Sequence, residues 1–295
     1  MYKYYDKGNF HIMEHRFDSI SEYIKYLDSA PISDAFNGRD LSSETGSYSF
    51  CKTNSFDEAK QLAKFGYHED FDKFLNLKNK LEKYIKMQAK RAATYNYYVG
   101  FTPDVKAYLE GNPLSMINKT YPPKQVIDIY YNSSNLAYVS NEQIFNRGAI
   151  TLSLVDALEK MGYLVSLHIF TMSSEGRQVH YGIYNLKKTT ERVNTQKLFF
   201  PMCHPSWFRR LGFRLKEVSP DIDRDWISGY GRTCDEETIR KVIDLKPNDI
   251  VVCRPDEMGV KGEDIIEDTN NFLEHVEKQY DVKNVEMPKI GRLKR

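Results

Sequence analysis

Apolar side chains recur at helical spacing through much of the first half of the chain. The helices predicted from this spacing lie at residues 19–27, 55–66 and 71–92. Aromatic runs between them predict short strands at residues 48–51 and 94–101. We therefore expect residues 1–121 to form a mainly helical region with short strands, which ends at Pro122 and Pro123.

Strand and helix patterns alternate in the second half. Apolar, β-rich runs predict strands at residues 124–132, 163–171, 179–187 and 249–254. Helical periodicity predicts helices at residues 141–162, 195–213, 235–243 and 263–279. Such alternation is typical of a parallel sheet with helices on both faces. The expected fold class is therefore α/β, with a Rossmann-like sheet in a second domain at residues 122–295.

Composition narrows the class of protein. The 295 residues include 42 Lys and Arg against 41 Asp and Glu, so the formal net charge of +1 creates no global field that would attract nucleic acid. Apolar residues make up 41% of the chain, which is too many for a disordered protein and enough for a buried core. A globular protein with one large domain or two is expected.

Hydropathy and the cysteines restrict the expected location. No window approaches the roughly 20 apolar residues that a membrane-spanning helix needs, and the N-terminal residues do not resemble a secretion signal. The four cysteines are far apart and form no CxxC pair, which favours reduced, buried thiols over a disulfide framework or a zinc ribbon. We expect no membrane contact and a location in a cytosol, or in a particle assembled there.

Three junctions between elements carry a family resemblance. The first predicted strand runs into Asn132-Ser133-Ser134-Asn135, a helix-glycine-strand junction follows at residues 147–170, and the last strand opens into Arg254-Pro255-Asp256. In this order of elements the second half resembles a von Willebrand factor A-type (vWA-like) domain of the CobT-like branch. The chain as a whole resembles an uncharacterised family of bacteriophage and prophage proteins.

The resemblance implies that loops at the strand tips bind another protein. The residues expected in these loops are Asn132, Ser133, Ser134, Asn135, Ser173, Ser174, Arg254 and Asp256. Because CobT-like domains work beside AAA+ ATPases of the MoxR type, such an ATPase is one expected partner, and other phage proteins are the alternative. A bacterial host cytoplasm or a virion is the implied location.

The metal motif of A-type domains is degenerate in this sequence. The motif is Asp-x-Ser-x-Ser, which here has Asn132 in place of the aspartate and Leu136 in place of the second serine. The later aspartate of the motif is displaced by two residues, to Asp256. We therefore expect no cofactor and no metal. If Mg²⁺ did bind, its ligands would be Asn132, Ser134 and Asp256; the alternative is a turn capped by side-chain hydrogen bonds.

Two groups of basic residues are candidates for binding an anionic partner. They are Lys83, Lys86, Lys90 and Arg91 on the predicted helix at residues 71–92, and Arg209, Arg210 and Arg214 beside Trp207 and Phe208. A solvated helix face explains the lysines equally well, because acidic residues interleave with them. Core packing of Trp207 and Phe208 is favoured over stacking on a single nucleic acid strand.

Catalytic patterns are weak. Cys203 and His204 are a possible thiol nucleophile and base, but adjacent residues seldom face one another. His11 and His15 have metal-pair spacing without a third ligand, and we expect a structural or exposed role for them. We therefore predict a protein-binding or scaffolding module rather than an enzyme. The alternatives are a virion structural or morphogenesis protein, and a nucleic-acid-binding protein or enzyme.

Overall fold

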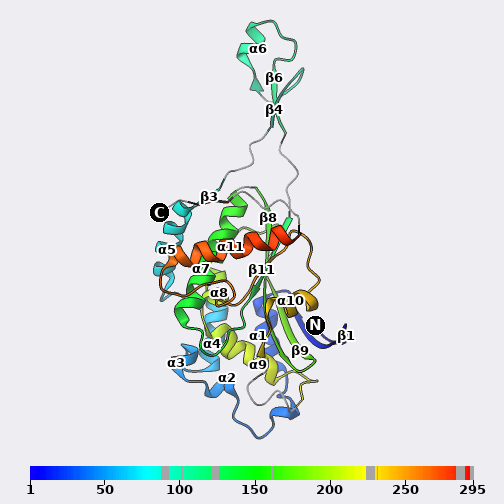
Figure 1. Ribbon diagram of the computed structural model, residues 1–295, viewed down its shortest axis with the longest axis vertical. Helices are drawn as coiled ribbons and strands as arrows, with labels where there is room; N and C mark the ends of the chain where they lie inside the picture. The colour runs from blue at the N-terminus through cyan, green and yellow to red at the C-terminus, as the bar shows by residue number, and fades with distance from the viewer. Residues whose placement is uncertain are drawn as a thin grey trace.

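A mixed seven-stranded β-sheet lies at the centre of the computed structural model (Figure 1). The structure describes residues 1–87, 93–100, 102–120, 126–160, 162–223, 230, 232–283 and 290–292. The strands of the main path, in spatial order, are β1 (Tyr2–Lys7), β2 (Phe10–Phe17), β9 (Gln178–Lys187), β8 (Leu164–Glu175), β7 (Val126–Asn132) and β11 (Ile250–Val252). The short strand β10 (Arg232–Thr233) pairs with the end of β8.

The sheet combines parallel and antiparallel strand pairs, which corrects the expectation of a parallel sheet. β7 is parallel to β8 and to β11, and β2 is parallel to β9. β8 and β9 instead form an antiparallel hairpin, because only Gly176 and Arg177 separate them. Gly176 has a φ of +58°, a conformation that suits glycine at a tight turn. The α/β class and the flanking helices are confirmed, whereas the sheet itself is mixed.

The first residues of the chain belong to the central sheet. β1 and β2 form an antiparallel hairpin. β2 also pairs with β9 in parallel, which joins the hairpin to the rest of the sheet. Ile12 and Phe17 of β2 are buried in the same hydrophobic cluster as Ile129 and Tyr184 of the later strands. The expected boundary at residues 121 and 122 therefore does not separate two cores, and residues 1–121 contribute strands as well as helices to one body.

The helices largely follow the predicted periodicity. Their bounds are α1 (Ile20–Ser29), α2 (Ser42–Thr45), α3 (Tyr48–Cys51), α4 (Phe56–Phe65), α5 (Phe71–Tyr84), α6 (Val105–Leu109), α7 (Asn141–Lys160), α8 (Thr195–Cys203), α9 (Phe213–Glu217), α10 (Glu236–Val242) and α11 (Ile265–Lys283), with a 3₁₀ turn η1 (Asp34–Phe36) and a π-helical segment η2 (Trp207–Gly212). The extended conformation expected at residues 48–51 is wrong, since α3 occupies them. No helix in the described part of the chain combines the length and apolarity needed to cross a membrane.

The long third helix ends earlier than expected. α5 stops at Tyr84, and a short strand β3 (Ile85–Met87) follows and pairs with β12 (Ile290–Arg292). Helical spacing alone did not indicate this change of conformation.

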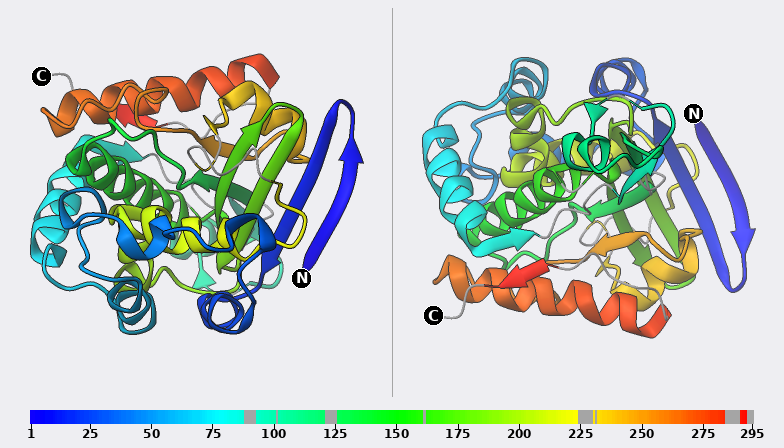
Figure 2. Two further views of the ribbon diagram at one scale, coloured as in Figure 1. Left: turned by 90° about the horizontal axis from the view of Figure 1, so that it is seen from below. Right: turned by 90° about the horizontal axis from the view of Figure 1, so that it is seen from above.

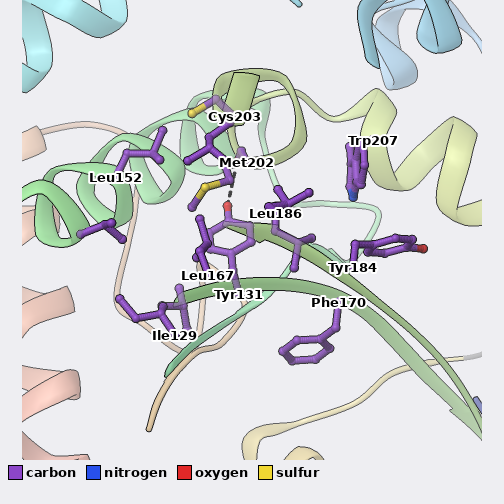
Figure 3. Packing of buried hydrophobic residues seen from close by; sticks show 14 of the residues in the cluster. Ile129, Tyr131, Leu152, Leu167, Phe170, Tyr184, Leu186, Met202, Cys203 and Trp207 are labelled. Carbon is purple, nitrogen blue, oxygen red and sulfur yellow. Dashed lines mark hydrogen bonds between the residues drawn. The ribbon is translucent and has the colours of Figure 1, made fainter. Parts of the chain in front are cut away.

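One face of the sheet packs against α7 and α8. Tyr131 and Leu167 point from this face toward Leu152 and Met202, and Phe170 points away on the opposite face (Figure 3). The Tyr131 hydroxyl donates a hydrogen bond to the carbonyl oxygen of Met202 at 2.7 Å. Beside α7, α11 packs against both α7 and β11 (Figure 2). These helices fix the carboxyl ends of β7 and β11, where a site was expected.

Close packing of α7 on α8 depends on Gly148. A Cβ atom at this position would lie 2.5 Å from Cys203 Sγ and 2.5 Å from the Met202 carbonyl oxygen. Gly148→Ala is therefore expected to lower the free energy of unfolding by about 1–3 kcal/mol, despite the higher helix propensity of alanine. Urea denaturation measures the change. In a Cys203→Ala background the loss should shrink but not vanish, because the backbone carbonyl remains; a neutral or stabilising Gly148→Ala would contradict the close packing.

A small β-arm projects from the body. It consists of β4 (Ala93–Tyr97), β5 (Thr102–Pro103) and β6 (Met116–Thr120), with helix α6 between β5 and β6. In Figure 1 this arm stands well away from the central sheet. We refer to residues 93–120 as the arm.

Candidate functional site

The predicted binding loop after β7 is closed on itself. All four of its residues, Asn132, Ser133, Ser134 and Asn135, are buried. Asn132 Oδ1 accepts a hydrogen bond from the Ser134 amide at 3.0 Å, which forms an Asx turn. Ser133 donates from its amide and its hydroxyl to the Phe170 carbonyl of β8. These side chains stabilise the loop against β8 and are not presented to solvent.

The same contacts argue against a magnesium site of the A-type kind. Ser134 Oγ accepts a hydrogen bond from the Met172 amide at 2.9 Å, and Asn132 Oδ1 is already used within the turn. Asp256, the third candidate ligand, is exposed and pairs both carboxylate oxygens with Arg254, at 3.2 and 3.1 Å. The oxygens that would hold Mg²⁺ are thus engaged elsewhere, and the residues present do not fit this ion.

The remaining strand-tip residues hold the sheet together at its edge. Ser173 is buried and pairs in register with Thr233 of β10, and Ser174 pairs with Arg232. The Arg254 guanidinium donates to the Thr233 carbonyl oxygen at 3.3 Å. Arg254 therefore links the end of β11 to β10, and among these residues only Asp256 is exposed.

The predicted arginine cluster is also internal. Arg209, Arg210 and Arg214 are all buried, and they bind the segment at residues 43–53. The Arg210 guanidinium donates to four backbone carbonyl groups, those of Ser43, Glu44, Gly46 and Thr53, at 2.6–3.0 Å. These three arginines thus form no exposed basic patch for nucleic acid.

The neighbours of the cluster agree with the expected packing. Arg209 bonds the Phe50 carbonyl oxygen at 2.7 Å, and Arg214 pairs with Glu44 and with Glu217. Trp207 and Phe208 lie in the interior, which confirms core packing for both.

The lysine group gives no accessible site within the described part of the chain. Lys83 and Lys86 lie in α5 and β3, and their side chains, like Lys90 and Arg91, are outside the described residues. Closer to the N-terminus of α5, Lys73 forms an ion pair with Glu142 of α7 at 2.8 Å. Lys78 pairs with Asp156 of α7 at 3.2 Å. Lys73 and Lys78 therefore attach α5 to α7.

Cys203 and His204 line a cavity of about 250 Å³ together with Tyr67, Asp70 and Lys73. Burial raises the pKa of the Cys203 thiol far above its usual value, and burial lowers the pKa of His204 to about 4. Both groups are neutral at pH 7. A protonated thiol is a poor nucleophile, so the arrangement does not support the Cys-His chemistry considered from the sequence.

Buried histidines form one cluster that the sequence did not indicate. Ser219 Oγ lies 2.7 Å from His15 Nε2 and 2.7 Å from His180 Nε2, and it donates to the Leu215 carbonyl oxygen at 2.9 Å. Both histidines are almost fully buried. Since the serine proton is committed to a backbone carbonyl, the cluster is a structural link between β2, β9 and the end of α9. His11, the other member of the HxxxH pair, is half-exposed and pairs with Asp6.

A line of polar groups crosses the other face of the sheet. Asp128 accepts a hydrogen bond from Ser166, His168 Nδ1 lies 2.6 Å from Asn185 Oδ1, and Lys246 binds Asp128 at 2.9 Å. Contacts with His168 and Lys246 hold the pKa of the Asp128 carboxyl well below its usual value. Because the Ser166 hydroxyl donates to Asp128, it is not activated by His168 as a nucleophile would be.

A third cluster combines a carboxylate, a thiol and an imidazole. Glu236 at the start of α10, Cys253 just after β11 and His275 in α11 place one potential ligand atom each within 4.8 Å of the others. His275 Nε2 lies 2.7 Å from Glu236 Oε2. The only sequence signal was the presence of these residue types, since their spacings match no metal motif.

Comparison with known proteins gives one match. A family model described as a domain of unknown function, DUF7192, matches residues 5–283. No curated protein and no solved structure matches the chain. The matched range runs from the middle of β1 to the end of α11 and includes all or part of every strand of the central sheet.

Proposed function

The chain belongs to the DUF7192 family, and we propose that it functions as a protein-binding module rather than as an enzyme. The observation that carries this proposal is the apolar surface of the arm. Large apolar side chains that are more than half exposed gather there within a short stretch. They are Tyr98, Val99, Val105, Tyr108 and Leu109.

Such a surface is costly to expose to water unless a partner covers it. Single exposed apolar side chains are common, but contiguous groups mark interaction sites. In α6, Tyr108 and Leu109 are 70% and 78% exposed. Tyrosine and leucine side chains of this kind bury a large apolar area when a second protein binds.

The tip of the arm is ordered by its own hydrogen bonds. Asp104 caps α6 by accepting from the Ala107 amide at 3.1 Å, and its own amide donates to the Ser115 carbonyl oxygen at 2.7 Å. Asn112 donates from its amide to the Ala107 carbonyl oxygen at 2.9 Å. A preorganised element loses less conformational entropy on binding, which favours the arm as a docking element.

The partner we propose is an AAA+ ATPase of the MoxR type, which rests on the resemblance to CobT-like vWA domains. The βαβ unit β7-α7-β8, with parallel β11 on the other side of β7, supports that resemblance. Burial of Asn132–Asn135 moves the proposed docking element from the strand tips to the arm. Nucleic acid is less favoured as a partner, because the Arg209, Arg210 and Arg214 cluster is internal.

Site-specific photocross-linking tests this proposal. A photoreactive amino acid at Tyr108, introduced in cells that express the full chain, is expected to cross-link to one ATPase. The matched control places the same amino acid at Phe65, which is 74% exposed on the body of the protein. Tyr108→Asp with Leu109→Asp should weaken ATPase binding at least about tenfold without changing the free energy of unfolding, whereas Phe65→Asp should not affect binding.

Other outcomes would overturn parts of this proposal. Cross-links that join only copies of the chain would make the arm a self-association element. Cross-links to particle proteins, with the chain present in purified virions by mass spectrometry, would favour the virion alternative over the ATPase. No cross-link from Tyr108 under conditions in which the chain is folded would remove the arm as a docking element.

A further inference from the structure

We propose that Glu236, Cys253 and His275 form a zinc-binding site. The three residues come from α10, the end of β11 and α11, so three different elements hold their ligand atoms in place. Among the residues that the structure describes, the ligand atoms of these three side chains come close enough together to hold one metal ion.

The geometry is close to that of a tetrahedral zinc site. Zinc binds sulfur at roughly 2.3 Å and nitrogen or oxygen at roughly 2.1 Å, so its ligands lie about 3.5 Å apart. The three ligand atoms here are within 4.8 Å of one another, and Glu236 Oε2 and His275 Nε2 are 2.7 Å apart. Rotamer adjustments of roughly an ångström would complete the arrangement. Three protein ligands leave the fourth position to water or to a further ligand.

The charges suit a divalent cation. Glu236 forms an ion pair with Arg240 and offers its other carboxylate oxygen to an ion. Zinc binds cysteine as the thiolate, so binding of the ion displaces the Cys253 proton. One carboxylate and one thiolate then balance the two positive charges of the ion.

The ligand types select zinc over the hard cations. Mg²⁺ and Ca²⁺ prefer oxygen ligands alone, whereas a thiolate, an imidazole and a carboxylate together are typical of Zn²⁺. Cys253 is fully buried, and the side chains of Glu236 and His275 are each 25% exposed. An ion can therefore reach the site from the side of the glutamate and the histidine.

Surrounding groups orient the ligands. The Arg240 guanidinium binds Glu236 Oε1 through Nε at 2.8 Å and Nη2 at 2.5 Å, which leaves Oε2 directed to His275. Arg147 Nη1 donates to the Cys253 carbonyl oxygen at 2.8 Å and fixes the backbone after β11. Such outer contacts are typical of protein metal sites. The positive charge of Arg240 opposes a cation, and the nearby Glu257 carboxylate offsets it.

Titration of the purified, metal-free full chain with Co²⁺ and with Zn²⁺ tests the site. We expect one equivalent of Co²⁺ to produce a thiolate-to-cobalt charge-transfer band that Zn²⁺ abolishes by displacement. Zinc binding should release the Cys253 proton and raise the melting temperature by several degrees. Cys253→Ser should lose the band completely, because serine supplies no thiolate.

Two further variants keep the test decisive. Cys234→Ser changes another buried cysteine outside the cluster and should keep the band and one equivalent of zinc. His275→Gln alters a partly exposed side chain, so it is expected to fold normally, as judged by circular dichroism, and to bind Co²⁺ more weakly. A folded wild-type chain without the charge-transfer band, or unchanged zinc binding in both Cys253→Ser and His275→Gln, would overturn the proposal.

Discussion

Lowering the pH from 7.5 to 5 is expected to reduce the free energy of unfolding by about 6 kcal/mol, because the buried His15, His180 and His204 resist protonation. Burial lowers the pKa of His204 to about 4. Burial, with a smaller contribution from the N-terminal ammonium, lowers the pKa of His15 to about 3. Burial also lowers the pKa of His180 well below its usual value, and His15 and Lys216 add to this effect.

The sign follows from the protons bound in each state. The unfolded chain protonates all three histidines near pH 6.5, whereas the folded chain keeps them neutral until a much lower pH. Their contribution to stability is therefore complete above about pH 6.5 and is lost as the pH falls below that value, at up to about 1.4 kcal/mol per pH unit for each histidine. Carboxylates remain largely ionised down to pH 5. The change in stability between pH 7.5 and 5 therefore reports mainly on the histidines.

Urea denaturation between pH 7.5 and 5 measures this loss. His15→Gln removes one of the three titrating groups while it retains an amide donor for Ser219, so it should reduce the pH-dependent loss by about a third. His11→Gln is the matched control, since the His11 side chain is 43% exposed, and it should leave the pH dependence unchanged. A wild-type loss that His15→Gln does not alter would show that protonation of these histidines does not govern acid stability.

Arg210→Met is expected to lower the free energy of unfolding by about 3–5 kcal/mol. Methionine fills much of the volume but cannot donate hydrogen bonds, so four carbonyl groups in the segment at residues 43–53 lose their partner. Each unsatisfied buried polar group costs roughly 1–3 kcal/mol, and part of this cost is relieved when the segment moves and admits water.

Two comparisons separate hydrogen bonding from charge in this experiment. Arg210→Lys retains the charge but has fewer donors and no planar guanidinium, so an intermediate loss is expected. Arg39→Met, at an exposed position, should change stability by no more than about 0.5 kcal/mol. If Arg210→Met cost no more than Arg39→Met, the contacts of Arg210 with residues 43–53 would not be stabilising.

Local signals were sufficient for elements that carry their own start and stop residues. Ser55 accepts a hydrogen bond from the Glu58 amide at the start of α4, and Gly66 follows its last residue, as the sequence predicted. The long α7 was recognised from its periodicity and from the strands on either side of it. These features depend on neighbours within a few positions, which the sequence displays directly.

Features that depend on distant partners were missed or read differently. β1 has a tyrosine-rich and charged sequence whose role as a strand follows from pairing with β2, and β2 in turn adds to β9. α3 is a single turn, too short to display a helical period. The sequence correctly indicated that a strand ends at Asn132 and that a helix begins at Asn141, but it could not show that the loop between them folds back on β8.

Charge patterns were ambiguous for the same reason. Arg209, Arg210 and Arg214 read as a basic patch in sequence, but each of them binds the segment at residues 43–53, which lies more than a hundred residues earlier in the chain. Glu236, Cys253 and His275 likewise come together only because α10 and α11 meet at the end of β11. Whether a charged side chain binds solvent, a backbone carbonyl or a metal is decided by tertiary contacts.

The parallel pairing of β2 with β9 has a consequence for folding kinetics. The hairpin of β1 and β2 precedes β8 and β9 along the chain, yet its place in the sheet exists only after β8 and β9 have formed. Closing so long a loop has a high entropic cost, which makes this step slow. Until it is complete, β9 presents an unpaired edge that other chains can bind. The N-terminal hairpin therefore acts as the closing strand pair that protects the nascent sheet from aggregation.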